Sequence, residues 1–175
     1  MVERNLLQSL NDAQKIEILR KNWFSHDARW QYATFLELGF EKGNKLNYKV
    51  SNQIGKVIMH RLMNALNMSS IQTIEEFQAI LEAAMDLYYP SPQFIYYFKR
   101  ESNTSLLGVM KFCSIYENVQ KVGISDQYKC ACIAMHSGWF EALGIKVMEE
   151  LKKSLKEGDE FCEFYLRIKK FGDSL

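Results

Sequence analysis

The chain has 175 residues, of which 47% are hydrophobic, with 22 Lys and Arg against 21 Asp and Glu. This length is enough for one domain with a buried core, and the hydrophobic fraction is too high for a disordered chain. The balanced charge gives no electrostatic basis for binding nucleic acid or an anionic membrane surface. No apolar run approaches the length of a membrane span, and the N-terminus is too polar for a secretory signal.

The four cysteines indicate a reducing compartment. A chain of this size without a secretory signal more often carries free thiols than a disulfide framework. We therefore expect a single cytoplasmic domain, residues 1–175.

The helical part is residues 1–89, where apolar side chains recur at helical spacing. Asn11 with Gln14, and Thr73 with Glu76, form the capping-box pattern that precedes a helix. Gly39 is a typical C-terminal stop. The predicted helices cover residues 13–23, 30–38, 46–65 and 74–88.

The α+β part, residues 90–175, begins where Pro90 and Pro92 end the helical pattern. Aromatic and β-branched runs at 94–100 and 105–113 flank a short polar tip, which predicts a hairpin. Two further helices are expected near 114–122 and 128–143, ending at Gly123 and Gly144.

The C-terminal tail is ambiguous. Val147, Leu151 and Leu155 lie four residues apart, which favours a helix, whereas the segment around Gly158 favours strand–turn–strand. Residues 161–168 alternate, and the wholly apolar set is expected to face the core. We predict an α+β fold with N-terminal helices packed on an antiparallel sheet, two further helices and a C-terminal strand hairpin. The core-facing set is Cys162, Phe164, Leu166 and Ile168.

Cys132 and His136 lie four apart, so on a helix they share one face. With Cys113 and Cys162 from other elements they would make a Cys₃His set, which zinc accepts. Cys130 would lie about 200° around the helix from Cys132, away from such a site. The spacings match no zinc finger or ribbon, so zinc or iron is compatible with the sequence without being required by it. Alternatively, these residues are buried core side chains.

The same residues allow nucleophilic chemistry. Cys132 or Cys113 could act as a thiolate with His136 as its base, which Glu141 or Asp159 could orient.

Residues 22–30 combine indoles with an imidazole and a carboxylate. Trp23, Asp27 and Trp30 share one helical face, with His26 at its edge and Arg29 nearby. Aromatic walls with a few polar groups are typical of a small-ligand site. The alternative is a core aromatic cluster in which Asp27 caps a new helix.

Three further residues, one polar and two small, have structural interpretations. Asn44 is expected on the surface. Gly43 and Gly55 are isolated inside helical patterns and carry no phosphate-binding motif.

Several segments resemble known families, and together they cover most of the chain. A family of uncharacterised prokaryotic proteins shares five patterns: NW…HDARW (22–30), GNKLN (43–47), FCSIYENVQKVGI (112–124), YKCACI (128–133) and GWFEALG (138–144).

The tail GDEFCEFYLRI (158–168) resembles those of two better-named groups. One is the L-2-amino-thiazoline-4-carboxylic acid hydrolases. The other is the 4-vinyl-reductase-type domains, which bind small hydrophobic or tetrapyrrole-related ligands and end in a similar Gly-Asp…Cys-x-Phe hairpin. The resemblance implies a strand hairpin in the tail, and it transfers no catalytic residues.

These observations predict a small-molecule-binding domain with an aromatic-walled pocket between the N-terminal helices and the sheet. An amide or thiazoline-type hydrolase using Cys and His, with or without zinc, is the alternative. A structural, homodimeric interaction protein is the third possibility. The expected pocket residues are Trp23, His26, Asp27, Arg29, Trp30, His136, Trp139 and Phe140.

Overall fold

The computed structural model describes residues 6–171, and the chain divides into two compact units after Gly43. The boundary falls inside the predicted helical part, residues 1–89. Each unit is described by itself.

The N-terminal unit contains a 3-10 helix, η1 (Leu6–Ser9), and the first part of α1 (Asp12–Leu66). The predicted capping box is present, since the Gln14 amide donates to Asn11 Oδ1 and the Asn11 amide donates to Gln14 Oε1, both at 2.9 Å. Gly39 has φ 76° and ψ 164°, which is outside the helical region, so the first helical run ends there and the predicted stop is confirmed.

Two helical runs lie in α1 where three were predicted, because only Gly39 interrupts the helical backbone, and the predicted gap between residues 23 and 30 was wrong. Residues 24–29 contain no Gly or Pro, so nothing in the backbone breaks the helix there. Asp27 therefore lies inside a helix and does not cap a new one.

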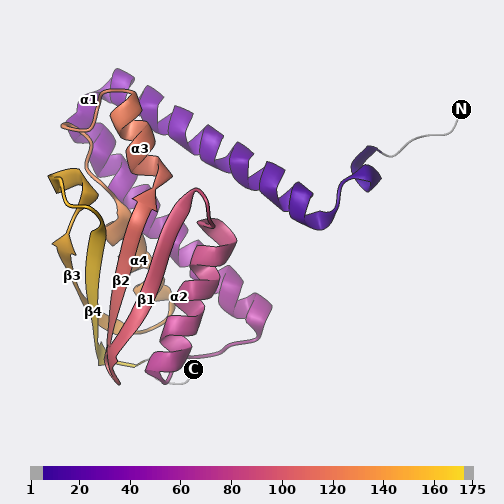
Figure 1. Ribbon diagram of the computed structural model, residues 1–175, viewed down its shortest axis with the longest axis vertical. Helices are drawn as coiled ribbons and strands as arrows, with labels where there is room; N and C mark the ends of the chain where they lie inside the picture. Colours follow the sequence, from indigo (N-terminus) through magenta and orange to yellow (C-terminus); the bar gives the residue numbers. More distant parts are fainter. Residues whose placement is uncertain (1–5, 172–175) are drawn as a thin grey trace, which may run out of the picture. The chain divides into compact units, whose positions relative to one another are not determined.

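The C-terminal unit contains a four-stranded antiparallel sheet in the order β1-β2-β4-β3, shown in Figure 1. This arrangement confirms the predicted α+β class and the predicted first hairpin. The strands are β1 (Phe94–Ser102), β2 (Ser105–Cys113), β3 (Lys146–Lys153) and β4 (Cys162–Lys170).

The ambiguous tail is a strand pair. Val147 of β3 pairs with Ile168 of β4, and Leu151 pairs with Phe164. Residues four apart lie on the same face of a helix and also on the same face of a strand, so this spacing alone does not distinguish the two structures. Phe164, Leu166 and Ile168 are buried and Cys162 is half-buried, as the predicted register requires.

The other helices are α2 (Ile74–Tyr88), α3 (Ser114–Lys121) and α4 (Cys132–Ala142), with a 3-10 turn η2 (Leu155–Glu157). The Thr73–Glu76 capping box of α2 is present. Gly123 and Gly144 have positive φ after α3 and α4, which confirms both predicted stops. The prediction that the last helix begins near Tyr128 was wrong, because α4 begins at Cys132.

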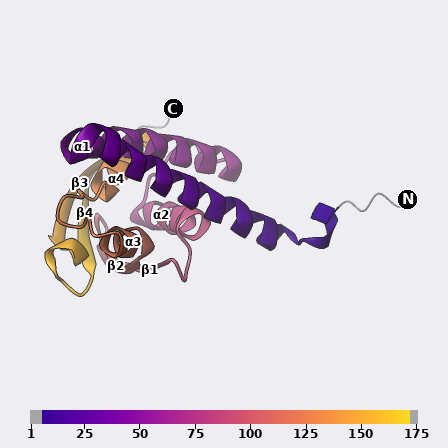
Figure 2. The same cartoon turned by 90° about the horizontal axis from the view of Figure 1, so that it is seen from above.

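Helices α2 and α4 lie on the same side of the sheet, as Figure 2 shows, and the rings of Phe77 and Phe140 join them with centroids 5.8 Å apart. The part of α1 after Gly43 crosses α4 where both helices carry glycine. A Cβ atom on Gly138 would overlap the backbone oxygen of Asn52, and one on Gly55 would overlap that of Met135. Gly55 therefore has a packing role in the C-terminal unit.

Within residues 6–171, we find no helix with both the length and the apolar character needed to cross a lipid bilayer.

Candidate functional site

A pocket lies between the inner face of the sheet and helices α2 and α4, entirely within the C-terminal unit. The space between its walls measures about 820 Å³ when the part open to solvent is included. Most of its lining is aromatic or aliphatic, and four side chains carry sulfur as thiols. The lining includes Leu81, Met85, Tyr96, Tyr97, Phe98, Val109, Met110, Cys113, Tyr116, Cys130, Cys132, His136, Trp139, Phe140, Ser154, Lys156, Cys162, Phe164 and Leu166.

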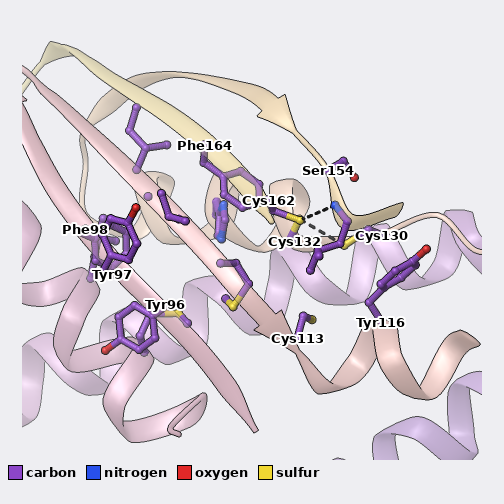
Figure 3. Close-up of a pocket in the computed structure, with 18 of the residues that line it drawn as sticks. Tyr96, Tyr97, Phe98, Cys113, Tyr116, Cys130, Cys132, Ser154, Cys162 and Phe164 are labelled. Atoms are coloured by element: carbon purple, nitrogen blue, oxygen red, sulfur yellow. Dashed lines mark hydrogen bonds between the residues drawn. The ribbon is translucent and has the colours of Figure 1, made fainter. Parts of the chain in front are cut away.

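The pocket has two chemically different ends. Figure 3 shows Tyr96, Tyr97 and Phe98 from β1 at one end and the four cysteines at the other. The thiol end also carries His136 and Lys156. The rest of the wall is mainly apolar, apart from the hydroxyl groups of Tyr96 and Tyr97, which suits a molecule with a hydrophobic body and a reactive or polar end.

Cys130 and Cys132 come together at the start of α4. Their Sγ atoms are 3.3 Å apart. The prediction that Cys130 points away from Cys132 was wrong, because Cys130 precedes the helix and does not follow its geometry. Cys130 is exposed and Cys132 is half-buried.

Asn44 fixes the loop that carries Cys130. Its Nδ2 donates to the backbone oxygen of Gln127 at 2.8 Å, and its Oδ1 accepts from the amide of Lys129 at 2.9 Å. Asn44 is only 4% exposed, so its predicted surface position was wrong. Burial is tolerated because both ends of the amide side chain are hydrogen-bonded.

The two neighbouring thiols have opposite acidities. The hydrogen bond with Cys132, aided by the positive charge of His136 and Lys156, lowers the pKa of Cys130 to about 6. The same hydrogen bond, together with burial, raises the pKa of Cys132 well above its ordinary value. Cys130 is therefore the more acidic of the two thiols, and Cys132 keeps its proton.

The other two cysteines are poor nucleophiles. Burial raises the pKa of Cys113 to about 11, and burial also raises the pKa of Cys162. Cys162 Sγ accepts a hydrogen bond from the Leu155 amide at 3.3 Å, which ties the η2 turn to β4.

His136 is oriented by Glu149 of β3. The Nδ1 atom of His136 lies 2.6 Å from Glu149 Oε1, and the side chains are 17% and 8% exposed. Glu141 and Asp159, which were predicted to orient the imidazole, have other partners. Glu141 pairs with Lys56, and Asp159 accepts from the Ser154 amide.

The predicted ligand residues fall into two groups. Trp139 and Phe140 are buried and line the pocket with His136. The others belong to the N-terminal unit: the Trp23 ring lies tilted against that of Phe24, with centroids 5.1 Å apart, and Trp30 is 71% exposed. The proposed ligand contacts of Trp23, His26, Asp27, Arg29 and Trp30 stay predictions.

The predicted Cys₃His metal set is not gathered. Among residues 6–171, no group of three or more His, Cys, Asp or Glu side chains is close enough together to hold a metal ion. Cys113, Cys132, His136 and Cys162 therefore share a pocket without forming such a set.

Sequence reasoning missed Cys130 and Glu149 as site residues. Cys130 was missed because the start of α4 at Cys132 could not be located in the sequence. The residue before it, Ala131, makes no side-chain capping hydrogen bond that would mark a helix start. Glu149 is one of two successive acidic residues, and only the pairing of β3 with β4 shows which of them faces the helix.

The fold has a counterpart among solved structures. The chain aligns with a trafficking protein particle complex subunit 3 from Naegleria fowleri, described as covalently bound to palmitic acid, with a TM-score of 0.58 and 15% identity. The alignment covers 91% of this chain and 98% of that one. At this identity the likeness concerns the fold alone.

An Fe(II) unliganded H-NOX protein mutant from K. algicida aligns over 78% of this chain and 74% of its own, with 12% identity and a TM-score of 0.39, which is too low to support an argument. No protein-family model matches the sequence, and no curated protein is significantly similar to it. The resemblance to thiazoline hydrolases and 4-vinyl-reductase-type domains stays a prediction.

Proposed function

We propose that the C-terminal unit binds a small, mainly apolar molecule in the pocket between the sheet and helices α2 and α4. The observation that carries this proposal is the wall itself: aromatic and aliphatic side chains from strands β1, β2 and β4 and from helices α2, α3 and α4 face one space. A mainly apolar wall with a few polar groups is typical of small-molecule sites. Burying apolar ligand surface there contributes roughly 25 cal/mol per Å².

A long-chain fatty acid is the ligand class that we favour. Its hydrocarbon chain suits the apolar wall, and its carboxylate would be attracted to Lys156 at the thiol end. The fold neighbour described as bound to palmitic acid supports this choice.

The indole N–H of Trp139 offers a second polar contact. It is buried without a hydrogen-bond partner in the described part of the chain. A ligand oxygen that reached it would satisfy a donor whose burial is otherwise costly.

The proposal predicts saturable binding of cis-parinaric acid, a fluorescent fatty acid, that palmitate displaces. Met110→Trp puts a larger side chain into the pocket wall and should weaken binding at least about tenfold, which is about 1.4 kcal/mol. Met148→Trp is the matched control, since Met148 is exposed on β3 and does not line the pocket. Fluorescence titration of the three proteins measures both effects.

Equal affinities of the two variants would contradict the pocket as the binding place. Absence of saturable binding by the unmodified chain would contradict the ligand class.

A hydrolase is the second candidate, because a Cys130 thiolate and the His136–Glu149 pair lie at the same end of the pocket. The acidities favour Cys130 over Cys113 and Cys132 as the nucleophile. Hydrolysis of L-2-amino-thiazoline-4-carboxylate by the chain, lost in Cys130→Ser, would support this function; no turnover would contradict it.

The predicted homodimer is tested by the molecular mass in solution.

A further inference from the structure

We propose that Cys130 and Cys132 form a thiol–disulfide exchange site whose substrates are small-molecule disulfides such as glutathione disulfide. Cys130 is the attacking residue, and Cys132 is the residue that resolves the mixed disulfide. This inference concerns the chemistry of the thiols and does not depend on the pocket's ligand.

The first support is distance. The two Sγ atoms are already 3.3 Å apart, and a disulfide bond of about 2.05 Å needs them to approach by only about 1 Å. Cys130 lies in the loop before α4 and can make this movement without breaking a helical hydrogen bond. Asn44 holds the neighbouring amide of Lys129, so the loop stays close to the helix start.

The second support is access. Cys130 is the more exposed residue and lines the open pocket, through which a dissolved disulfide would approach its sulfur, whereas Cys132 is half-buried. A reachable thiol with a second thiol in contact is the arrangement of cysteines that oxidise reversibly.

The charges around the pair favour this division of roles. His136 and Lys156 stabilise the negative charge of the Cys130 thiolate, and the Sγ atom of Cys132 lies 3.3 Å from that of Cys130. The other titratable groups that face the pair come from other elements. They are Tyr48 of α1, Cys113 at the end of β2, Glu149 of β3 and Cys162 of β4.

The exchange takes place in two steps. The Cys130 thiolate attacks one sulfur of glutathione disulfide, which forms a Cys130–glutathione bond, breaks the glutathione S–S bond and releases one glutathione thiolate. That thiolate takes the proton of Cys132. The Cys132 thiolate then attacks Cys130 Sγ, forms the protein disulfide and releases the second glutathione thiolate, which takes a proton from water. Two protein thiols lose two electrons in total, and glutathione disulfide gains them.

The test exposes the intact chain to glutathione disulfide at pH 7 and follows its mass and its peptides. The unmodified chain should lose two hydrogen masses, with the bridge mapped to Cys130 and Cys132, and dithiothreitol should restore the thiols. Cys132→Ser should stop at one bound glutathione on Cys130. Cys130→Ser should react at least about tenfold more slowly, because the remaining thiols are protonated at this pH. Cys162→Ser and Cys113→Ser are the matched controls and should form the bridge as the unmodified chain does.

A short iodoacetamide pulse on the unmodified chain gives a second readout that needs no variant. Cys130 should be labelled at least about tenfold faster than Cys113. A bridge that involves Cys113 or Cys162, a mixed disulfide that persists on Cys130 of the unmodified chain, or equal labelling of all four cysteines would overturn the proposal.

Discussion

Replacement of Gly138 by Ala should destabilise the C-terminal unit by about 3 kcal/mol. The added Cβ would overlap the backbone oxygen of Asn52 and lie 3.1 Å from the backbone nitrogen of Lys56. Both are backbone atoms of α1, so no side chain can rotate away, and the two helices must separate. Helix α4 carries Trp139 and Phe140, so the pocket wall should loosen as well. Urea unfolding measures the change in the free energy of unfolding.

The sign of this change is decisive. Ala has a higher helix propensity than Gly by about 1 kcal/mol, so without the helix contact Gly138→Ala should stabilise the protein. Ser137→Ala, one residue earlier on the exposed side of α4, is the matched control and should change stability by less than about 1 kcal/mol, although it removes the bond from Ser137 Oγ to Glu141. An unchanged or higher stability of Gly138→Ala would mean that the helices are not in close contact at this position.

Strands β1, β2 and β4 were predictable from the sequence because their signals are local, whereas β3 was left open between helix and strand. The hairpin of β1 and β2 follows from two aromatic and β-branched runs around a polar tip, and the apolar face of β4 follows from strict alternation. The helix stops at Gly123 and Gly144 were equally local.

The close crossing of α1 and α4 was not predictable, because a glycine inside a helical pattern gives no indication of its contact. Gly55 and Gly138 lie more than eighty positions apart in the sequence. Only the fold shows that both lie where α1 crosses α4, and that the missing side chains let the two backbones come close. Asn44 was misplaced for the same reason. Its two hydrogen bonds go to backbone groups of the loop before α4, which carry no sequence signal.

The candidate site was predicted in part. Cys132, His136, Trp139 and Phe140 line one pocket, as their helical spacing suggested. The acidic residue that orients His136 was wrongly assigned, since Glu149 comes from a strand whose pairing the sequence left open. The contact between Cys130 and Cys132 depends on where α4 begins. A helix that began before Cys130 would place the two thiols on different sides, whereas the observed start at Cys132 leaves Cys130 in the loop, beside Cys132.

Replacement of His136 by Leu should destabilise the protein by about 3–5 kcal/mol, because it leaves the Glu149 carboxylate buried without its partner. The side chain of Glu149 is 8% exposed, and within residues 6–171 its hydrogen-bond partner is His136. A carboxylate in this position loses hydration that only the imidazole replaces. Thermal and urea unfolding at pH 7 measure the loss.

The matched experiment is a double-mutant cycle with Glu149→Leu. The double variant His136→Leu/Glu149→Leu removes both polar groups and should recover part of the stability that the His136→Leu single variant loses. Glu149→Gln keeps an oxygen acceptor for the imidazole and should cost less than His136→Leu. A double variant whose loss equals the sum of the two single losses would show that the two side chains do not interact, and His136 would then be held in the pocket by its ring contacts with Trp139 and Phe164 alone.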